Sequence, residues 1–204
     1  MAYTQEDWIE RSRNRTDISN FLYHLTRDND EYDYMEVLIK ILNERKLIGS
    51  TTASGFIVGD DRAVCFQDTT AYGLAQNSFH EHKLRRKSKS MKVRYLSIGL
   101  AFNKKYIYDK GGRPVIYEDT EVAKNMLPKD ERLRIVNFNL GDSNKIIDWT
   151  HEREWRVKGD FEFDLKQTYV ILTNSEVYTM FVNEVADNIL KSLGGIVVLE
   201  PVLT

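Results

Sequence analysis

Residues 148–157 combine many charged side chains with an ending that is typical of a strand. The stretch carries Glu152 and Glu154 together with two arginines, a histidine and two tryptophans, and it closes on Trp-Arg-Val before Gly159. Successive side chains of an extended chain point to opposite faces, so we expect Glu152, Glu154 and Arg156 on one face. The two carboxylates would then lie about 6 to 7 Å apart, close enough to share a substrate. The alternative is a solvated strand face whose charges form cross-strand ion pairs.

The remaining apolar patterns favour an α+β fold over a doubly wound parallel sheet. Short runs rich in apolar and β-branched residues predict strands at 21–26, 55–61, 62–66, 93–102, 113–117, 134–140, 168–173 and 195–199. Helical periodicity and capping residues predict helices within 3–20, 34–45, 67–77 and 175–193. The helices are concentrated early and late, as in α+β proteins. We expect one domain over residues 1–204, with 1–20 as a peripheral helical arm, and a hairpin that joins 55–61 to 62–66.

Composition excludes several classes of protein. The chain has 204 residues, of which 42% are hydrophobic, and this is too many for wholesale disorder. It contains no apolar run of 18 residues and no signal-peptide pattern in residues 1–15, so we expect a cytoplasmic protein without a membrane partner. Its single cysteine, Cys65, excludes an intramolecular disulfide, and with only four histidines the chain has no zinc-binding set. We therefore expect no metal cofactor.

Charge is distributed unevenly, although the net charge is only −2. Residues 83–105 carry nine basic residues and no acidic one, whereas residues 28–36 carry five acidic residues. The segment 83–92 has too few apolar side chains to pack, so we predict an exposed loop. Such a loop is usually just solvated, but clustered cations also bind polyanions without sequence preference. The nucleic-acid contacts expected from this segment are Lys83, Arg85, Arg86, Lys87 and Lys89.

Three motifs, taken in order, resemble the ADP-ribosyltransferase superfamily. They are Tyr-His-Leu-Thr at 23–26, Ala-Val-Cys-Phe-Gln-Asp-Thr-Thr-Ala-Tyr at 63–72 and Glu-Arg-Glu at 152–154. In that superfamily a first-strand His or Arg, a central strand with an aromatic or Ser/Thr, and a Glu on a later strand surround NAD. The run 23–157 is also similar to bacterial phage-defence proteins of the abortive-infection and DarT-like kinds. The resemblance implies a mainly antiparallel, split β-sheet core with flanking helices.

The resemblance also implies roles for individual residues. Glu154 would hold a ribose hydroxyl and stabilise the oxocarbenium-like cation that forms when nicotinamide leaves. Glu152 would orient or deprotonate the acceptor. The residues implied to contact NAD, which serves as the substrate, are His24, Thr26, Cys65, Phe66 and Tyr72.

Several of these residues have a purely structural interpretation as well. His24 on an apolar strand is typical of a core histidine bonded to a backbone carbonyl, and Tyr72 on a short helix is typical of a packing residue. Cys65 lies between Val64 and Phe66 in a run that should be buried. Without a histidine partner, Cys65 is not a candidate nucleophile.

Two functions from different classes follow from these patterns. The first is an ADP-ribosyltransferase or NAD glycohydrolase that modifies a protein or a nucleic acid in phage–host conflict, as a toxin or an antiviral factor. The second is a non-catalytic nucleic-acid- or protein-binding regulatory module of a defence system with the same fold. Two acids beside His24 suit an oxocarbenium site and not a phosphate-binding module, so the enzyme is favoured. The resemblance implies an antitoxin or another defence protein as partner.

Overall fold

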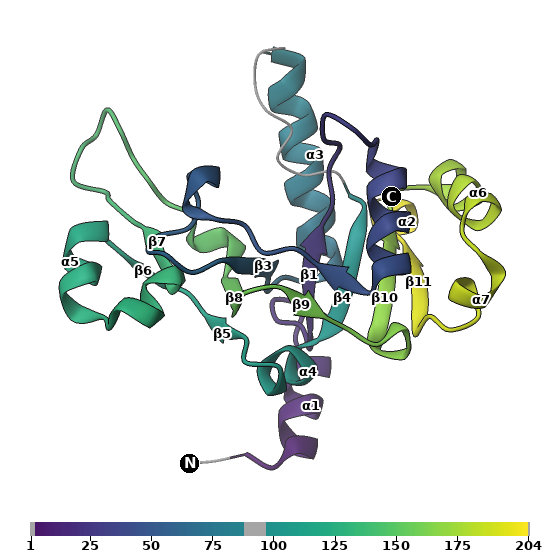
Figure 1. Ribbon diagram of the computed structural model, residues 1–204, viewed down its shortest axis with the longest axis horizontal. Coiled ribbons are helices and arrows are strands. Elements are labelled where there is room, and N and C mark those ends of the chain that lie inside the picture. The colour runs from purple at the N-terminus through teal and green to yellow at the C-terminus, as the bar shows by residue number, and fades with distance from the viewer. Residues whose placement is uncertain (1–2, 88–96, 204) are drawn as a thin grey trace. The chain divides into compact units, whose positions relative to one another are not determined.

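The structure, a computed structural model, describes residues 3–87 and 97–203 (Figure 1). The chain forms two compact units from interleaved segments. Unit 1 comprises residues 1–45, 69–103 and 163–204, and unit 2 comprises residues 46–68 and 104–162. The expectation of a single domain over residues 1–204 stays a prediction.

The described part of unit 1 contains four strands and most of the longer helices (Figure 1). Its strands are β1 (Phe21–Leu25), β4 (Gly99–Asn103), β10 (Thr168–Leu172) and β11 (Gly195–Val198), in the order β11-β10-β4-β1. The pairs β1–β4 and β4–β10 are antiparallel, and β10–β11 is parallel. The helical elements are α1 (Gln5–Arg13), α2 (Tyr34–Glu44), α3 (Ala71–Lys87), η4 (Leu165–Gln167), α6 (Ser175–Glu184), α7 (Asp187–Leu190) and α8 (Glu200–Leu203).

One buried hydrophobic cluster of unit 1 lies on one face of this sheet. Tyr23 of β1 is opposite Ala101 of β4 in the strand register. These two residues pack with Ile171 of β10, Leu74 of α3 and Leu199, and all five side chains are buried. The apolar runs that predicted the strands therefore supply the residues that hold them together.

The predicted helix starts of unit 1 are confirmed by two capping boxes. At α1 the Thr4 hydroxyl accepts from the Asp7 N–H, and the Asp7 carboxylate accepts from the Thr4 N–H. At α2 the Asp33 carboxylate accepts from the N–H groups of Met35 and Glu36 at 2.8 and 2.9 Å. Each box satisfies N–H groups that a helix leaves without an internal partner.

Unit 2 is built from shorter elements (Figure 1). Its strands are β2 (Lys46–Leu47), β3 (Ala63–Gln67), β5 (Arg113–Pro114), β6 (Ile116–Glu118), β7 (Ile135–Asn137), β8 (Glu154–Lys158) and β9 (Phe161–Glu162). Strand β8 lies between β3 and β5 and is antiparallel to both, β2 pairs antiparallel with β9, and β6 pairs parallel with β7. The helical elements are η1 (Thr52–Ser54), α4 (Lys104–Asp109), α5 (Thr120–Met126), η2 (Lys129–Arg134) and η3 (Thr150–Glu152).

The β3–β8 pair has one apolar face and one polar face. Val64 is opposite Val157, and Phe66 is opposite Trp155, whereas Cys65 is opposite Arg156 and Gln67 is opposite Glu154. On the apolar face the rings of Phe66 and Phe161 meet edge to face, with centroids 5.4 Å apart. The alternation along β8 therefore turns Glu154 and Arg156 to the side away from this aromatic packing.

Two strand predictions in unit 2 are wrong. Residues 55–61 form no strand, so the expected hairpin with 62–66 does not exist; β3 pairs instead with β8. Gly55 and Gly59 adopt φ angles of 79° and 89°, in the left-handed region that interrupts extended backbone. The expected strand 113–117 is divided at Val115, because Arg113–Pro114 pairs with β8 and Ile116–Glu118 pairs with β7.

At the level of fold class the prediction is confirmed: the described chain is α+β, and most of its strand pairs are antiparallel. No helix within residues 3–87 and 97–203 is long and apolar enough to cross a membrane.

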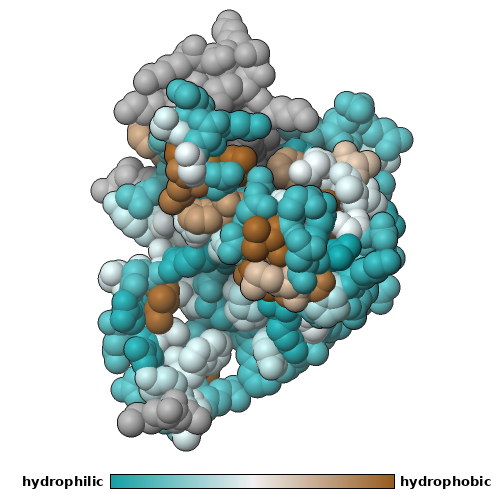
Figure 2. Space-filling model, turned by 90° about the vertical axis from the view of Figure 1, so that its left-hand side faces the viewer, coloured by the Kyte–Doolittle hydropathy of each residue, from teal (hydrophilic) through white to brown (hydrophobic). Residues whose placement is uncertain are grey.

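Exposed large hydrophobic side chains of unit 2 include Phe56, Val122, Met126, Leu140 and Ile146. Figure 2 shows hydrophobic areas separated by hydrophilic side chains on one side of the molecule, and such scattered exposure is normal for a protein surface.

The capping box of α2 yields a prediction about stability. Replacing Asp33 with Ala should reduce the free energy of unfolding by about 1 kcal/mol, because two N–H groups of the first turn lose their acceptor. Asp30→Ala is the control, since Asp30 is an exposed acid of the same segment outside the box. Urea unfolding of both variants measures the difference, and equal midpoints would contradict the role assigned to the box.

Candidate functional site

The chain entering β8 is not the continuous strand that the sequence suggested. Glu152 belongs to η3, Arg153 has a φ of 44°, and β8 begins at Glu154. The cause is local, because the Asp148 carboxylate accepts from the Thr150 N–H at 2.9 Å and from its hydroxyl at 2.6 Å. This turn competes with extended backbone. The expectation that Glu152 and Glu154 occupy alternate positions of one strand is therefore wrong.

Arg156 is the most heavily bonded side chain of the polar face. It is only 3% exposed, and Glu154 is 7% exposed. Its Nε donates to Glu154 Oε1 at 2.7 Å, and its Nη2 donates to Glu154 Oε2 at 3.2 Å. The same guanidinium donates to the carbonyl oxygens of Leu133, Ile135 and Phe56 at 2.6, 3.2 and 3.1 Å. The pair is therefore a buried, bidentate ion pair whose cation also joins three backbone segments.

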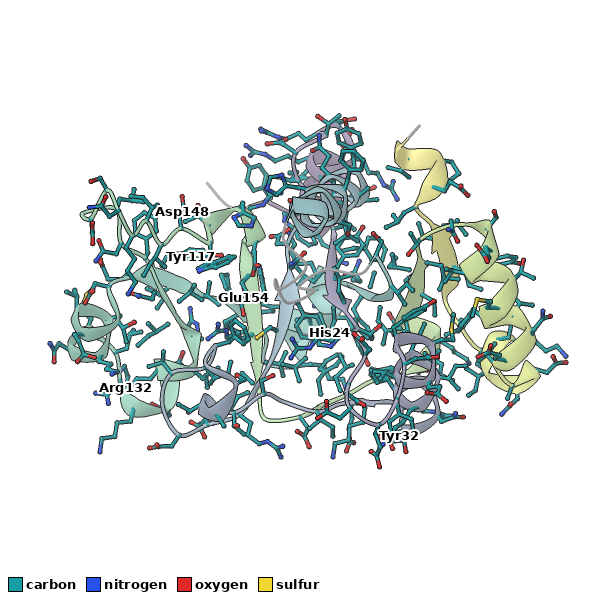
Figure 3. The ribbon with its side chains drawn as sticks, turned by 90° about the horizontal axis from the view of Figure 1, so that it is seen from above. His24, Tyr32, Tyr117, Arg132, Asp148 and Glu154 are labelled. Atoms are coloured by element: carbon teal, nitrogen blue, oxygen red, sulfur yellow. The ribbon has the colours of Figure 1, made fainter. Side chains whose placement is uncertain are left out.

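Tyr117 and Cys65 lie next to this pair. The Tyr117 hydroxyl accepts from the Glu154 N–H at 2.9 Å, and Figure 3 shows Tyr117 beside Glu154, with Asp148 nearby. Burial raises the pKa of Tyr117, so the phenol stays protonated near neutral pH. Burial, followed by the charge of Glu154, raises the pKa of the Cys65 thiol. Cys65 is therefore a protonated thiol at neutral pH, and this agrees with the exclusion of cysteine catalysis.

Gln67 adds an unusual acceptor to the polar face. It lies opposite Glu154 in the β3–β8 register and is only 9% exposed. Its Oε1 atom has no hydrogen-bond partner among the described residues. Buried acceptors without a partner are rare, because each costs the free energy of removing it from water. A ligand that carries N–H or O–H donors would remove this cost.

Sequence reasoning missed Arg156, Tyr117 and Gln67 as members of the site. The signal for Arg156 was present, since a buried strand rarely carries Glu and Arg at alternate positions unless the two are paired. Tyr117 and Gln67 carried no such signal, because only the strand pairing brings them to Glu154.

The residues expected to bind NAD are divided between the units. His24, Thr26 and Tyr72 belong to unit 1, whereas Cys65, Phe66, Glu152 and Glu154 belong to unit 2. The buried Thr26 hydroxyl donates to the carbonyl oxygen of Ile98 at 3.2 Å. Phe66 is 1% exposed, and its ring lies on the apolar face. Tyr72 is 56% exposed, so it is not the packing residue considered as its structural alternative.

The basic segment is helical where it is described. Lys83, Arg85, Arg86 and Lys87 lie on α3, so the predicted loop is wrong for these positions; Lys89 lies outside the described residues. Leu, Lys and Arg are strong helix formers, and they extend the helix that was expected to end near Asn77. Within the described residues no group of three or more His, Cys, Asp and Glu side chains is arranged to hold a metal ion.

No protein-family model, curated protein or solved structure matches this chain. The interpretation of the site therefore depends on the chemistry of its own residues and on the motif resemblance described above.

The buried ion pair can be tested by a double-mutant cycle. Arg156→Met should destabilise the protein by about 3 to 5 kcal/mol, because the Glu154 carboxylate is left buried without a counter-ion. Glu154→Met combined with Arg156→Met should recover part of this loss, since only the three carbonyls then lack their donor. Urea unfolding of the single and double variants measures the coupling. Lys191→Met, which removes an exposed ion pair with Asp187, is the control and should change little.

Additive effects of Arg156→Met and Glu154→Met would contradict a direct pairing. A large effect of Lys191→Met would show that the assay responds to the removal of any cation.

Proposed function

We propose that this protein is an NAD-dependent ADP-ribosyltransferase that modifies a macromolecule, either a protein or a nucleic acid. Its reaction breaks the bond between the nicotinamide nitrogen and C1′ of the ribose, and the bonding electron pair leaves with nicotinamide. A nucleophilic oxygen or nitrogen of the acceptor then bonds to C1′ and gives its proton to Glu152. Water in place of the acceptor gives NAD hydrolysis.

The observation that carries the proposal is the buried carboxylate of Glu154, which Arg156 holds at a defined position. A carboxylate fixed in a site that excludes water stabilises a developing positive charge without having to reorganise. The oxocarbenium-like ribose is such a charge, and it exists only near the transition state, so this interaction lowers the barrier more than it strengthens substrate binding.

Gln67 supports a ligand of the same chemical kind. Its Oε1 atom on the polar face has no hydrogen-bond donor among the described residues. The ribose hydroxyls and the carboxamide of NAD are donors that could bond to it. The protonated Tyr117 hydroxyl, next to Glu154, is a further group that can donate to an oxygen of the substrate.

Arg156 also provides the competing explanation for Glu154. The guanidinium neutralises much of the carboxylate's charge, and its three carbonyl contacts suit a purely structural brace. The catalytic and the structural explanation differ in one measurable property, because only a catalytic Glu154 requires that the protein turns over NAD.

Turnover is tested by incubating the protein with NAD labelled in its nicotinamide, with and without cell lysate. We expect release of nicotinamide, and Glu154→Gln should lower its rate by about two orders of magnitude or more. Glu131→Gln is the matched control, because Glu131 belongs to a surface ion pair of the same unit with Arg134. Melting temperatures of both variants separate lost chemistry from lost folding.

Glu152→Gln should spare much of the hydrolysis and reduce transfer to the acceptor, because Glu152 acts on the acceptor side. A wild-type protein that releases no nicotinamide under either condition would exclude the proposed activity and leave the ion pair as a brace.

The role of Gln67 has its own test. Gln67→Met removes a buried acceptor without a partner and keeps a similar volume, so the free energy of unfolding should stay equal or rise. The KM for NAD should rise at the same time if Oε1 binds the substrate. An unchanged KM in a stable variant would show that Gln67 has no part in binding.

A further inference from the structure

The polar face of unit 2 is covered by protein. Glu154, Arg156 and Gln67 are all buried. A carboxylate stabilises a ribose cation by direct contact, and an amide oxygen accepts a hydrogen bond at about 3 Å. A ligand of the size of NAD cannot make either contact with a buried side chain. Binding at this face therefore requires that part of its cover moves.

Residues 51–59 form part of this cover, and we call them the strap. The carbonyl oxygen of Phe56 accepts from Arg156 Nη2 at 3.1 Å. Ile57 is 3% exposed and belongs to a buried hydrophobic cluster of unit 2, against which the partly buried Cys65 packs. The strap therefore lies against the guanidinium and close to the thiol.

The strap is held more weakly than β7, which covers the same guanidinium. Residues 51–56 are exposed, and the hydrogen bonds described for residues 51–55 join residues within the strap. Gly55 and Gly59 have φ angles of 79° and 89°, a region that glycine enters and leaves without steric cost. By contrast, β7 pairs with β6 and begins at the fully buried Ile135. Lifting the strap therefore costs less free energy than displacing β7.

We propose that the strap opens at its two glycines and that a ligand reaches Glu154 and Gln67 in the open state. In the closed state the Phe56 carbonyl satisfies one N–H of Arg156. When the strap leaves, this donor becomes free on the same face as the Gln67 Oε1 acceptor. A ligand that carries both an acceptor oxygen and a hydroxyl or amide donor satisfies both groups, so its binding favours the open state.

Opening of the strap is independent of NAD cleavage, because it is a property of the backbone of residues 51–59. The identity of the ligand as NAD, in contrast, rests on the proposed function. Opening and NAD binding are therefore measured separately.

Cys65 reports the opening. It is the single cysteine of the chain, and it packs against the cluster that contains Ile57 of the strap. Opening removes the strap from the thiol, so the rate at which a maleimide modifies Cys65 rises with the open fraction. Mass spectrometry of the intact chain follows this rate without denaturant.

Gly55→Ala should shift the strap toward the open state. Alanine is strained at a φ of 79° in the closed strap and relaxes when the strap opens, and its Cβ meets nothing within 4 Å, so the strain is confined to the backbone. We expect Cys65 to be modified about five- to tenfold faster in this variant. Gly111→Ala is the matched control, because Gly111 has a φ of 89° and equally open surroundings in the same unit but lies outside the strap. Its Cys65 should react at the wild-type rate.

NAD is the ligand tested on the same proteins. When a ligand binds an open state of low population, its apparent Kd falls by the factor by which the open fraction rises. Gly55→Ala should therefore lower the Kd for NAD by about the same five- to tenfold factor, and Gly111→Ala should leave it unchanged. Tryptophan fluorescence, recorded immediately after mixing, measures the Kd before turnover.

Equal rates of modification in the wild type and Gly55→Ala would show that the strap does not open. Equal acceleration in Gly55→Ala and Gly111→Ala would show that Cys65 reacts through global unfolding, and either result overturns the proposal. Faster modification with an unchanged Kd for NAD would also overturn it, because the ligand would then not need the open state. If NAD binds none of the proteins while Gly55→Ala still accelerates modification, the proposed NAD chemistry fails and the opening stands.

Discussion

The arrangement of unit 2 depends on burying one guanidinium. Arg156 cannot lose its charge at physiological pH, so its position inside the protein requires an anion and acceptors for its remaining N–H groups. Glu154 supplies the anion, and the carbonyl groups of Leu133, Ile135 and Phe56 supply the acceptors. Because these carbonyls come from η2, β7 and the segment before Ile57, one side chain constrains three separate stretches of backbone.

The same contacts give the polar face its chemical character. A fixed carboxylate, a protonated phenol, a protonated thiol and an unpartnered amide oxygen lie around one ion pair. Buried ion pairs generally contribute little net stability, because removing both charges from water costs about as much as their attraction returns. The pair is better suited to fixing the position of Glu154. This holds whether the carboxylate stabilises a ribose cation or only holds Arg156 against the backbone carbonyls.

In unit 1, sequence patterns that span a few residues predicted the helices and the core strands, but not the length of α3. The helices within 3–20 and 34–45 were predicted because helical periodicity and the signals of a helix start act over a few residues. The core strands were predicted because their apolar runs are continuous in sequence. The length of α3 was underestimated, since its basic end was interpreted as too polar to pack; a helix needs no buried side chain at every turn when its residues are strong helix formers.

The sequence by itself determined the α+β class, the main helices and strands, and the position of Glu154 and Arg156 on one face, because periodicity and caps act over a few residues. It also indicated the charges and motifs from which NAD chemistry and nucleic-acid binding were predicted. Only the tertiary structure decided that β3 pairs with β8 and that Arg156 binds Phe56, a residue 100 positions away. Those outcomes depend on contacts between distant segments, and the free energy of such contacts is not encoded in any single stretch of residues.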